Sequence, residues 1–396
     1  MKKSPKKRSF HHRDYPQKVK NNKKKIDQRK SIWVAPLLLL TLLFVASSVV
    51  LGQFPFVPTP QERFSVSAMF IMGDSSVNCG ENSFYSTLFD QDSLLFPCNG
   101  SQPTLIPQLL AEKMGLPQIP QFYNQNGTIE DLISGLNFGS SPATIMTAGE
   151  LGFQALNQQL RQVLETIQLL ELQLGKGEAQ EHIQSSLFYL SFGKDDYINL
   201  FLNNISDVRP RFGSTGFAQI LVDQMDRVLK DLYSADVRKI LCMGIGPLGC
   251  SPRILYESYS YRVGVAGEGN CSSEINELIV EYNNMLSMRL TELSLELSDA
   301  ELVFCDVYRG MEEIITHPGQ YGFDEVKWAC CGGGRYGGRI GCLSEEMVCD
   351  ESSTHVWWDF YDPTEAVNIL LADSIWSTQS LGDLCSPITV QQLASM

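Results

Sequence analysis

A serine that follows a short apolar run is the clearest candidate for chemistry in this sequence. Residues 68–72 are apolar, and Gly73, Asp74, Ser75 and Ser76 come directly after them. A serine on a tight turn between a strand and a helix can be exposed as a nucleophile, with backbone N–H groups nearby to stabilise an oxyanion. The alternative is an ordinary helix N-cap, in which the serine oxygen only accepts a hydrogen bond from the first turn. The local pattern alone leaves both interpretations open.

Eleven cysteines form the second chemically distinctive set. Exported chains use such a set for disulfides. The Cys-Cys-Gly-Gly-Gly run at 330–334 lacks the paired Cys-x2-Cys spacing of a zinc site and the Gly-Lys-Ser/Thr of a phosphate loop, which favours a disulfide-stapled surface loop. The odd count leaves at least one free thiol. Cys242 is our candidate because it lies in the apolar run 240–243.

Short apolar runs alternate along the chain with longer amphipathic segments. The runs predict strands at 68–72, 187–192, 239–243 and 302–306, and helical periodicity predicts helices at 148–174, 216–232 and 275–297. Strands separated by helices indicate a parallel sheet with right-handed crossovers. Ligands of such sheets bind at the carboxyl ends of the strands, which is where Ser75 is expected.

The N-terminal segment has a composition of its own. Residues 1–30 hold 13 of the 31 Lys and Arg but only two of the 45 Asp and Glu, so we expect a disordered cytoplasmic tail over 1–31. Residues 32–52 carry no charge and are long enough for a transmembrane signal-anchor, with the basic flank in the cytoplasm. A long signal peptide cleaved near 46–48 is the alternative. A Pro-rich linker at 53–66 and a single domain at 67–396 complete the expected organisation.

Both arrangements export the body of the protein, as a single-pass membrane protein with a lumenal or extracellular domain or as a secreted one. The net charge is -14 despite the basic tail, so the body is strongly acidic and should repel nucleic acids. No period of 20–50 residues is present, which excludes solenoids and propellers. The sequence also contains four N-x-S/T glycosylation sequons, at Asn99, Asn126, Asn204 and Asn270.

Six motifs in order resemble those of the plant GDSL esterase/lipase branch of the SGNH hydrolases. They are residues 70–75, 135–138, 190–199, 244–250, the Cys-rich stretch 329–349, and Trp358-Asp359 with 363–366. The resemblance covers about 68–375. It implies a three-layer α/β/α sandwich with a flavodoxin-like parallel sheet. It also implies no cofactor or metal, and ester substrates drawn from lipids or cell-wall polysaccharides. We expect disulfides among Cys330, Cys331, Cys342 and Cys349, and a further one between Cys250 and Cys271.

The catalytic residues that the resemblance implies are only partly present. The family's nucleophile matches Ser75, and the acid that orients its base matches Asp359. The family's histidine falls on Asp362, and its oxyanion-binding asparagine falls on Asp195. The family's oxyanion-binding glycine falls near Ser141, which precedes a proline that has no N–H to donate.

These departures predict impaired or altered catalysis. Aspartate is a poor base at neutral pH, and an ionised Asp195 offers no donor to an oxyanion. The first hypothesis is an ester hydrolase that uses Ser75 with altered machinery, and the second is an inactive pseudoenzyme that serves as a binding or scaffolding protein. A loop shift that brings His355 to Ser75 would restore a base. Convergence of Asp195, Asp359 and Asp362 on a cation such as Ca²⁺ is a further idea that the spacing does not require.

Overall fold

The computed structural model describes residues 64–78, 105–123, 128–146, 154–202, 207–261 and 269–396. All of the described residues belong to one compact unit, Arg63–Met396. The predicted tail at 1–31, the predicted anchor at 32–52 and most of the predicted linker lie outside the described residues. Within the described part, no helix is long and apolar enough to cross a membrane.

A five-stranded sheet forms the centre of this unit, in the order β1-β4-β5-β6-β9. Its first four strands are parallel and β9 is antiparallel. The strands are β1 (Met69–Gly73), β4 (Leu187–Ser191), β5 (Lys239–Met243), β6 (Glu301–Cys305) and β9 (Cys385–Ser386). The four predicted strands are therefore confirmed to within one residue, and β9 was not predicted.

A short segment extends the sheet beyond β1. The Ile71 N–H donates to the Leu136 carbonyl at 2.9 Å, and the Phe138 N–H donates to the Ile71 carbonyl at 2.8 Å. In chain order, β1 is the first parallel strand, this segment is the second, and β4, β5 and β6 are the third to fifth. Across the sheet these strands have the flavodoxin-like order 2-1-3-4-5. The connections change direction between β1 and β4, and this is the point where doubly wound sheets bind ligands.

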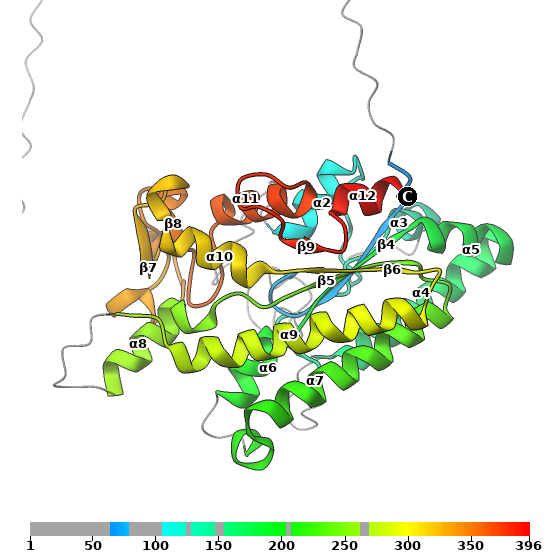
Figure 1. The fold of residues 1–396 in the computed structure, drawn as a ribbon. Helices are drawn as coiled ribbons and strands as arrows, with labels where there is room; N and C mark the ends of the chain where they lie inside the picture. The colour runs from blue at the N-terminus through cyan, green and yellow to red at the C-terminus, as the bar shows by residue number, and fades with distance from the viewer. Residues whose placement is uncertain (1–63, 79–104, 124–127, 147–153, 203–206, 262–268) are drawn as a thin grey trace, which may run out of the picture. The chain divides into compact units, whose positions relative to one another are not determined.

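Helices cover both faces of the sheet (Figure 1). In β1, Phe70 and Met72 join a core with α4, α5, α7 and α9, whereas Met69 and Ile71 join a second core with α2, α10, α11 and α12. Burial on both faces explains why the strands read as continuous apolar runs. The helices are α2 (Ile106–Lys113), α3 (Ile129–Ser134), α4 (Leu156–Leu174), α5 (Lys176–Ser185), α6 (Lys194–Asp196), α7 (Val208–Ser234), α8 (Pro252–Tyr261), α9 (Ser273–Glu296), α10 (Val307–Thr316), α11 (Glu365–Trp376) and α12 (Val390–Ser395).

The three predicted helices correspond to α4, α7 and α9, but their limits differ. The prediction began the first of them at residue 148, whereas α4 begins at Leu156, directly after the short strand β3 (Gln154–Ala155). β3 pairs with β2 (Ala143–Thr144), which follows the segment beside β1. Helix α7 begins eight residues before the predicted start because it continues across a non-helical Gly213.

A smaller two-stranded sheet of β7 (Glu325–Ala329) and β8 (His355–Trp357) holds the Cys-rich loop. The predicted stapling of this loop is confirmed, as are the Cys250–Cys271 pair and the buried free thiol of Cys242. A fourth disulfide, which was not predicted, joins β6 to β9. The pairs are Cys250–Cys271, Cys305–Cys385, Cys330–Cys349 and Cys331–Cys342.

Candidate active site

Ser75 lies on the turn that leaves β1, and a buried glutamine fixes the start of that turn. The Gln159 side chain of α4 accepts from the Gly73 N–H at 2.9 Å and donates to the Gly73 carbonyl at 2.8 Å. A Cβ on Gly73 would lie 2.4 Å from Val77 and 2.7 Å from the Ser191 carbonyl, so only glycine fits there. The backbone just before Ser75 is therefore held on both sides.

Asp74 ties the Ser75 turn to the turn after β4. Its Oδ1 accepts from the Ser76 N–H at 3.0 Å and the Ser76 hydroxyl at 2.8 Å, and its Oδ2 accepts from the Asp195 N–H at 3.2 Å. Burial raises the pKa of Asp74, while the positive charge of Lys194 and these hydrogen bonds oppose the rise. Asp74 thus places the residues after β1 and β4 next to each other.

Asp195 is the direct partner of Ser75. Gly193, with φ 106°, lets the chain turn sharply after β4 and begin α6. The Ser75 hydroxyl then donates to Asp195 Oδ1 at 2.6 Å. Burial, followed by the neighbouring negative charge of Asp74, raises the pKa of Asp195 to about 7. A carboxylate with this pKa can exchange a proton near neutral pH.

The second oxygen of Asp195 occupies two backbone donors. Oδ2 accepts from the Ser75 N–H at 3.2 Å and from the Ala143 N–H at 2.9 Å. In a serine hydrolase, N–H groups around the nucleophile would point to the substrate oxyanion. The sequence pointed to the neighbourhood of Ser141 for such a donor. Pro142, the next residue, has no N–H, and the N–H that donates to Asp195 Oδ2 belongs to Ala143.

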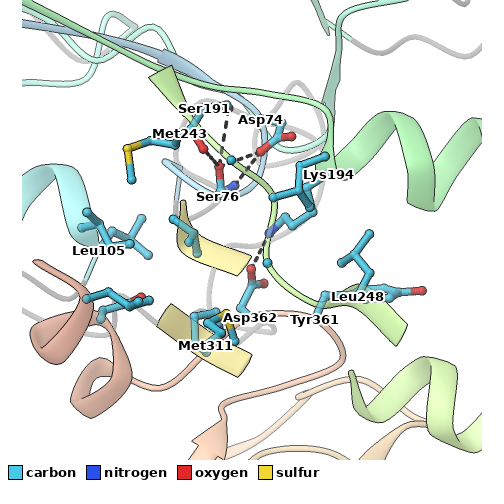
Figure 2. A pocket seen from close by; sticks show the side chains of 18 of the residues that line it. Asp74, Ser76, Leu105, Ser191, Lys194, Met243, Leu248, Met311, Tyr361 and Asp362 are labelled. Atoms are coloured by element: carbon cyan, nitrogen blue, oxygen red, sulfur yellow. Dashed lines mark hydrogen bonds and ion pairs between the residues drawn. The ribbon is translucent and has the colours of Figure 1, made fainter. Parts of the chain in front are cut away.

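Lys194 and Asp362 form an ion pair beside this turn (Figure 2). The Lys194 Nζ lies 2.5 Å from Asp362 Oδ1, and the two side chains are 11% and 22% exposed. Burial alone would lower the pKa of Lys194, but the carboxylates of Asp362, Asp74 and Asp195 together raise it. Lys194 is therefore an ammonium ion, and Asp362, which the resemblance aligned with the family's histidine, binds this cation. Sequence reasoning missed Lys194; a lysine directly after a buried strand and glycine was the available signal.

Asp359 shapes the turn that carries Asp362. Its Oδ1 accepts from the Tyr361 N–H at 3.1 Å and from the Asp362 N–H at 3.0 Å. Burial and the neighbouring charge of Asp362 raise the pKa of Asp359 to about 7. Asp359 therefore positions residue 362, which is the part that the resemblance implied for it, although no histidine stands there.

Among the described residues, no histidine forms a hydrogen bond with Ser75. The His355 Nδ1 lies 3.1 Å from the Glu351 carbonyl oxygen, and His317 Nδ1 lies 3.1 Å from a Glu313 carboxylate oxygen. His182 is on α5, and His11 and His12 lie outside the described residues. The expectation that a loop shift could bring His355 to Ser75 has no support in this geometry.

The idea of a cation held by three aspartates also fails here. Asp195 faces Ser75 and two N–H groups, Asp359 faces two other N–H groups, and Asp362 faces Lys194. Over the described ranges, no group of three or more His, Cys, Asp or Glu side chains is arranged to hold a metal ion. Of the predicted glycosylation sites, Asn270 is exposed; Asn99, Asn126 and Asn204 lie outside the described residues.

A family model and the curated relatives both indicate the same family for this chain. The family model described as GDSL-like lipase/acylhydrolase matches residues 69–375. Two GDSL esterase/lipases of Arabidopsis thaliana are 32% and 30% identical, over 343 and 348 residues; each match covers 84% of this chain, and 89% and 86% of the respective relatives. A solved structure of a possible lipase from Chitinophaga pinensis is 10% identical with a TM-score of 0.29, covering 78% of this chain and 95% of that one. On the family model and the Arabidopsis relatives, the chain belongs to the GDSL-like lipase/acylhydrolase family.

Proposed function

We propose that this protein hydrolyses carboxylic esters slowly, with Ser75 as the nucleophile and Asp195 as the proton acceptor. The observation that carries the proposal is the 2.6 Å hydrogen bond from the Ser75 hydroxyl to Asp195 Oδ1. A nucleophilic serine needs a base within hydrogen-bond reach, and Asp195 meets this condition. Its pKa of about 7 makes it a far better base than an ordinary aspartate.

The reaction balances with these two residues and water. Ser75 Oγ bonds to the ester carbonyl carbon as its proton moves to Asp195 Oδ1, and the carbonyl π electrons move to the oxygen. The tetrahedral intermediate collapses, the bond to the alcohol oxygen breaks, and that oxygen takes the proton from Asp195. Water then attacks the acyl-Ser75 ester and gives a proton to Asp195. Cleavage of the Oγ–carbon bond releases the carboxylic acid and returns the proton to Ser75.

Rates should be low for two reasons. The Ser75 and Ala143 N–H groups already donate to Asp195 Oδ2, so they stabilise a substrate oxyanion poorly. Loss of one oxyanion donor typically costs about 10²–10³ in kcat. The base is also a carboxylate rather than an imidazole. The resemblance supports esters of lipids or cell-wall sugars as the substrate class.

The test is release of p-nitrophenol from p-nitrophenyl butyrate by the full-length protein, with Ser75→Ala as the matched control. Hydrolysis above the Ser75→Ala rate is the expected result. A rate equal to the control for every ester tried would overturn the proposal.

Binding without turnover is the second candidate, and the Lys194–Asp362 pair favours it. In this pair, Asp362 stands where the family carries its histidine base, and it binds Lys194 instead. Asp195 also accepts from the two N–H groups that would otherwise be free for an oxyanion. The matched test is the triple variant Lys194→Ala, Asp195→Asn and Asp362→His. If the natural protein is a pseudoenzyme, only this variant should show Ser75-dependent hydrolysis.

We further propose that the catalytic domain lies in the lumen or outside the cell, attached by the predicted anchor at 32–52. The four disulfides of the described region support this location, because disulfides persist in oxidising compartments. In sealed microsomes, we expect the domain to be protected from added protease, and we expect detergent to remove this protection. Protection of the basic tail instead of the domain would show the opposite topology.

A further inference from the structure

A cavity of about 80 Å³ lies at the carboxyl ends of β4, β5 and β6, next to the turn that carries Ser75. Part of its lining is polar, with Ser76 and the Lys194–Asp362 pair. Most of the rest is apolar and includes Met243, Met311 and Trp357. Figure 2 shows the labelled polar side chains and Met243, Leu105 and Met311 around the cavity.

The polar lining is already paired. The Ser76 hydroxyl donates to Asp74 at 2.8 Å and lies 2.7 Å from the Ser191 hydroxyl, and Lys194 binds Asp362. A guest in this cavity would gain little from these groups unless it displaced one of the bonds. The apolar side chains, by contrast, gain from contact with a hydrocarbon guest. The lining therefore suits an apolar group.

The position of the cavity connects it to the nucleophile. Asp74 and Ser76, the two neighbours of Ser75 in the chain, both line it, and so does Asp362 on the opposite segment. Ser75 itself is not part of the lining, but because both of its chain neighbours are, a short chain attached to a carbonyl carbon at Ser75 can extend into this apolar space. We propose that the cavity binds the acyl group of the ester and restricts the substrates to short acyl chains. This inference rests on the proposed hydrolytic function.

The volume sets the chain length. An apolar cavity of about 150 Å³ is large enough for benzene, which has six carbons. By proportion, a cavity of 80 Å³ takes about three carbons beyond the carbonyl, which corresponds to acetyl, propionyl and butyryl groups. Two residues of the lining, Gly246 and Met311, are close-packed, because a Cβ added to Gly246 would lie 2.7 Å from Met311 Sδ. Longer chains would exceed this space.

The main test is kcat/KM of the full-length protein for p-nitrophenyl esters from acetyl to octanoyl. We expect a rise of up to about fourfold per methylene as far as butyryl, since a buried methylene contributes about 0.8 kcal/mol, and a fall of at least about tenfold by octanoyl. Met311→Ala lengthens the cavity and should raise the hexanoyl to butyryl ratio by about tenfold. Gly246→Ala should lower the butyryl to acetyl ratio instead. Met288→Ala, the same change at a site that is 60% exposed on α9, should move neither ratio.

Binding separates the failure of this inference from the failure of the proposed function. Titration calorimetry of the Ser75→Ala variant with methyl butyrate and methyl hexanoate needs no turnover. Saturable binding of methyl butyrate that Gly246→Ala weakens supports the cavity assignment, even if no ester is hydrolysed. Ser75-dependent hydrolysis whose chain-length profile is the same in wild type, Met311→Ala and Gly246→Ala would overturn the assignment and leave the hydrolytic function standing. Absence of saturable methyl butyrate binding in Ser75→Ala would also overturn it.

Discussion

Asp195→Asn tests the role of Asp195 with the smallest change in shape. The substitution replaces Oδ1 or Oδ2 by an amide nitrogen and removes the negative charge. The amide oxygen can still accept from the Ser75 and Ala143 N–H groups, as Oδ2 does in the wild type. The amide cannot take the Ser75 proton across the 2.6 Å contact. The two hypotheses for Asp195 therefore predict opposite changes in rate.

If Asp195 is the base, the variant loses general-base catalysis. Such catalysis typically contributes about 10²–10⁴ in rate, so kcat/KM should fall by that factor or to the Ser75→Ala level, a loss of about 3–5 kcal/mol of transition-state stabilisation. If another group takes the Ser75 proton and Asp195 only obstructs the oxyanion position, the amide adds a donor, and the rate should rise by about 10²–10³. The sign of the change decides between the two.

The assay is the initial rate of p-nitrophenyl butyrate hydrolysis between pH 5 and pH 9, for wild type, Asp195→Asn and Ser75→Ala. A base must be deprotonated, and burial raises the pKa of Asp195 to about 7. The wild-type kcat/KM should therefore rise with pH up to about 7 and level off above it, and the variant should lack this rise. Asp324→Asn, an exposed aspartate away from the site, is the matched control and should keep the wild-type profile. An Asp195→Asn protein that is as active as wild type, with activity still dependent on Ser75, would refute the role of Asp195 as base.

Three further predictions concern stability. The pKa of Asp195 in the folded state is raised above its value in the unfolded chain, so the contribution of Asp195 to stability is full below about pH 4 and is lost as the pH rises to about 7. Asp195→Asn should therefore raise the Tm relative to wild type at pH 8 but hardly at pH 4. An equal shift in Tm at both pH values would contradict this. Lys194→Met leaves the partly buried carboxylate of Asp362 without its cation, so the free energy of unfolding in urea should fall by about 1–3 kcal/mol, and the double variant with Asp362→Leu should recover most of this loss. A double variant no more stable than Lys194→Met would argue against the pair. Replacing Cys305 and Cys385 together by alanine opens a loop of 80 residues, and the loss of its chain-entropy constraint should lower the free energy of unfolding by about 4–5 kcal/mol. A decrease below about 1 kcal/mol would show that other contacts hold β9 in place.

The sheet was largely predictable from sequence, and the exception has a physical explanation. Strands β1, β4, β5 and β6 are short apolar runs because both of their faces are buried. Strand β9 has only two residues, too few for any periodicity, and a disulfide to β6 holds it in place from 80 residues away. A local pattern carries no information about such a contact.

The site was predictable only in part, for a related reason. Motif positions pointed to Ser75, Asp195 and Asp362, and the structure brings Ser75 and Asp195 together. The partner of Asp362 is Lys194, 168 residues earlier, and nothing in either local sequence indicates the pairing. The Gln159 clamp on Gly73 was missed as well, because a glutamine in an amphipathic helix looks like an ordinary surface residue until its burial is known.

The three unusual residues of the site form one electrostatic unit. Asp195 adds a buried negative charge close to Asp74, and Asp362 adds a partly buried one close to Asp359, and the mutual repulsion of these carboxylates would be costly. Lys194 is the neighbouring cation, and its charge opposes the rise in the pKa of Asp74, Asp195 and Asp359 alike. An imidazole at position 362 would face this ammonium, which disfavours the imidazolium that must form when the imidazole takes the Ser75 proton. Asp362→His alone should therefore give little or no ester hydrolysis. If the natural protein is a pseudoenzyme, a gain of hydrolytic activity requires Lys194, Asp195 and Asp362 to be exchanged together.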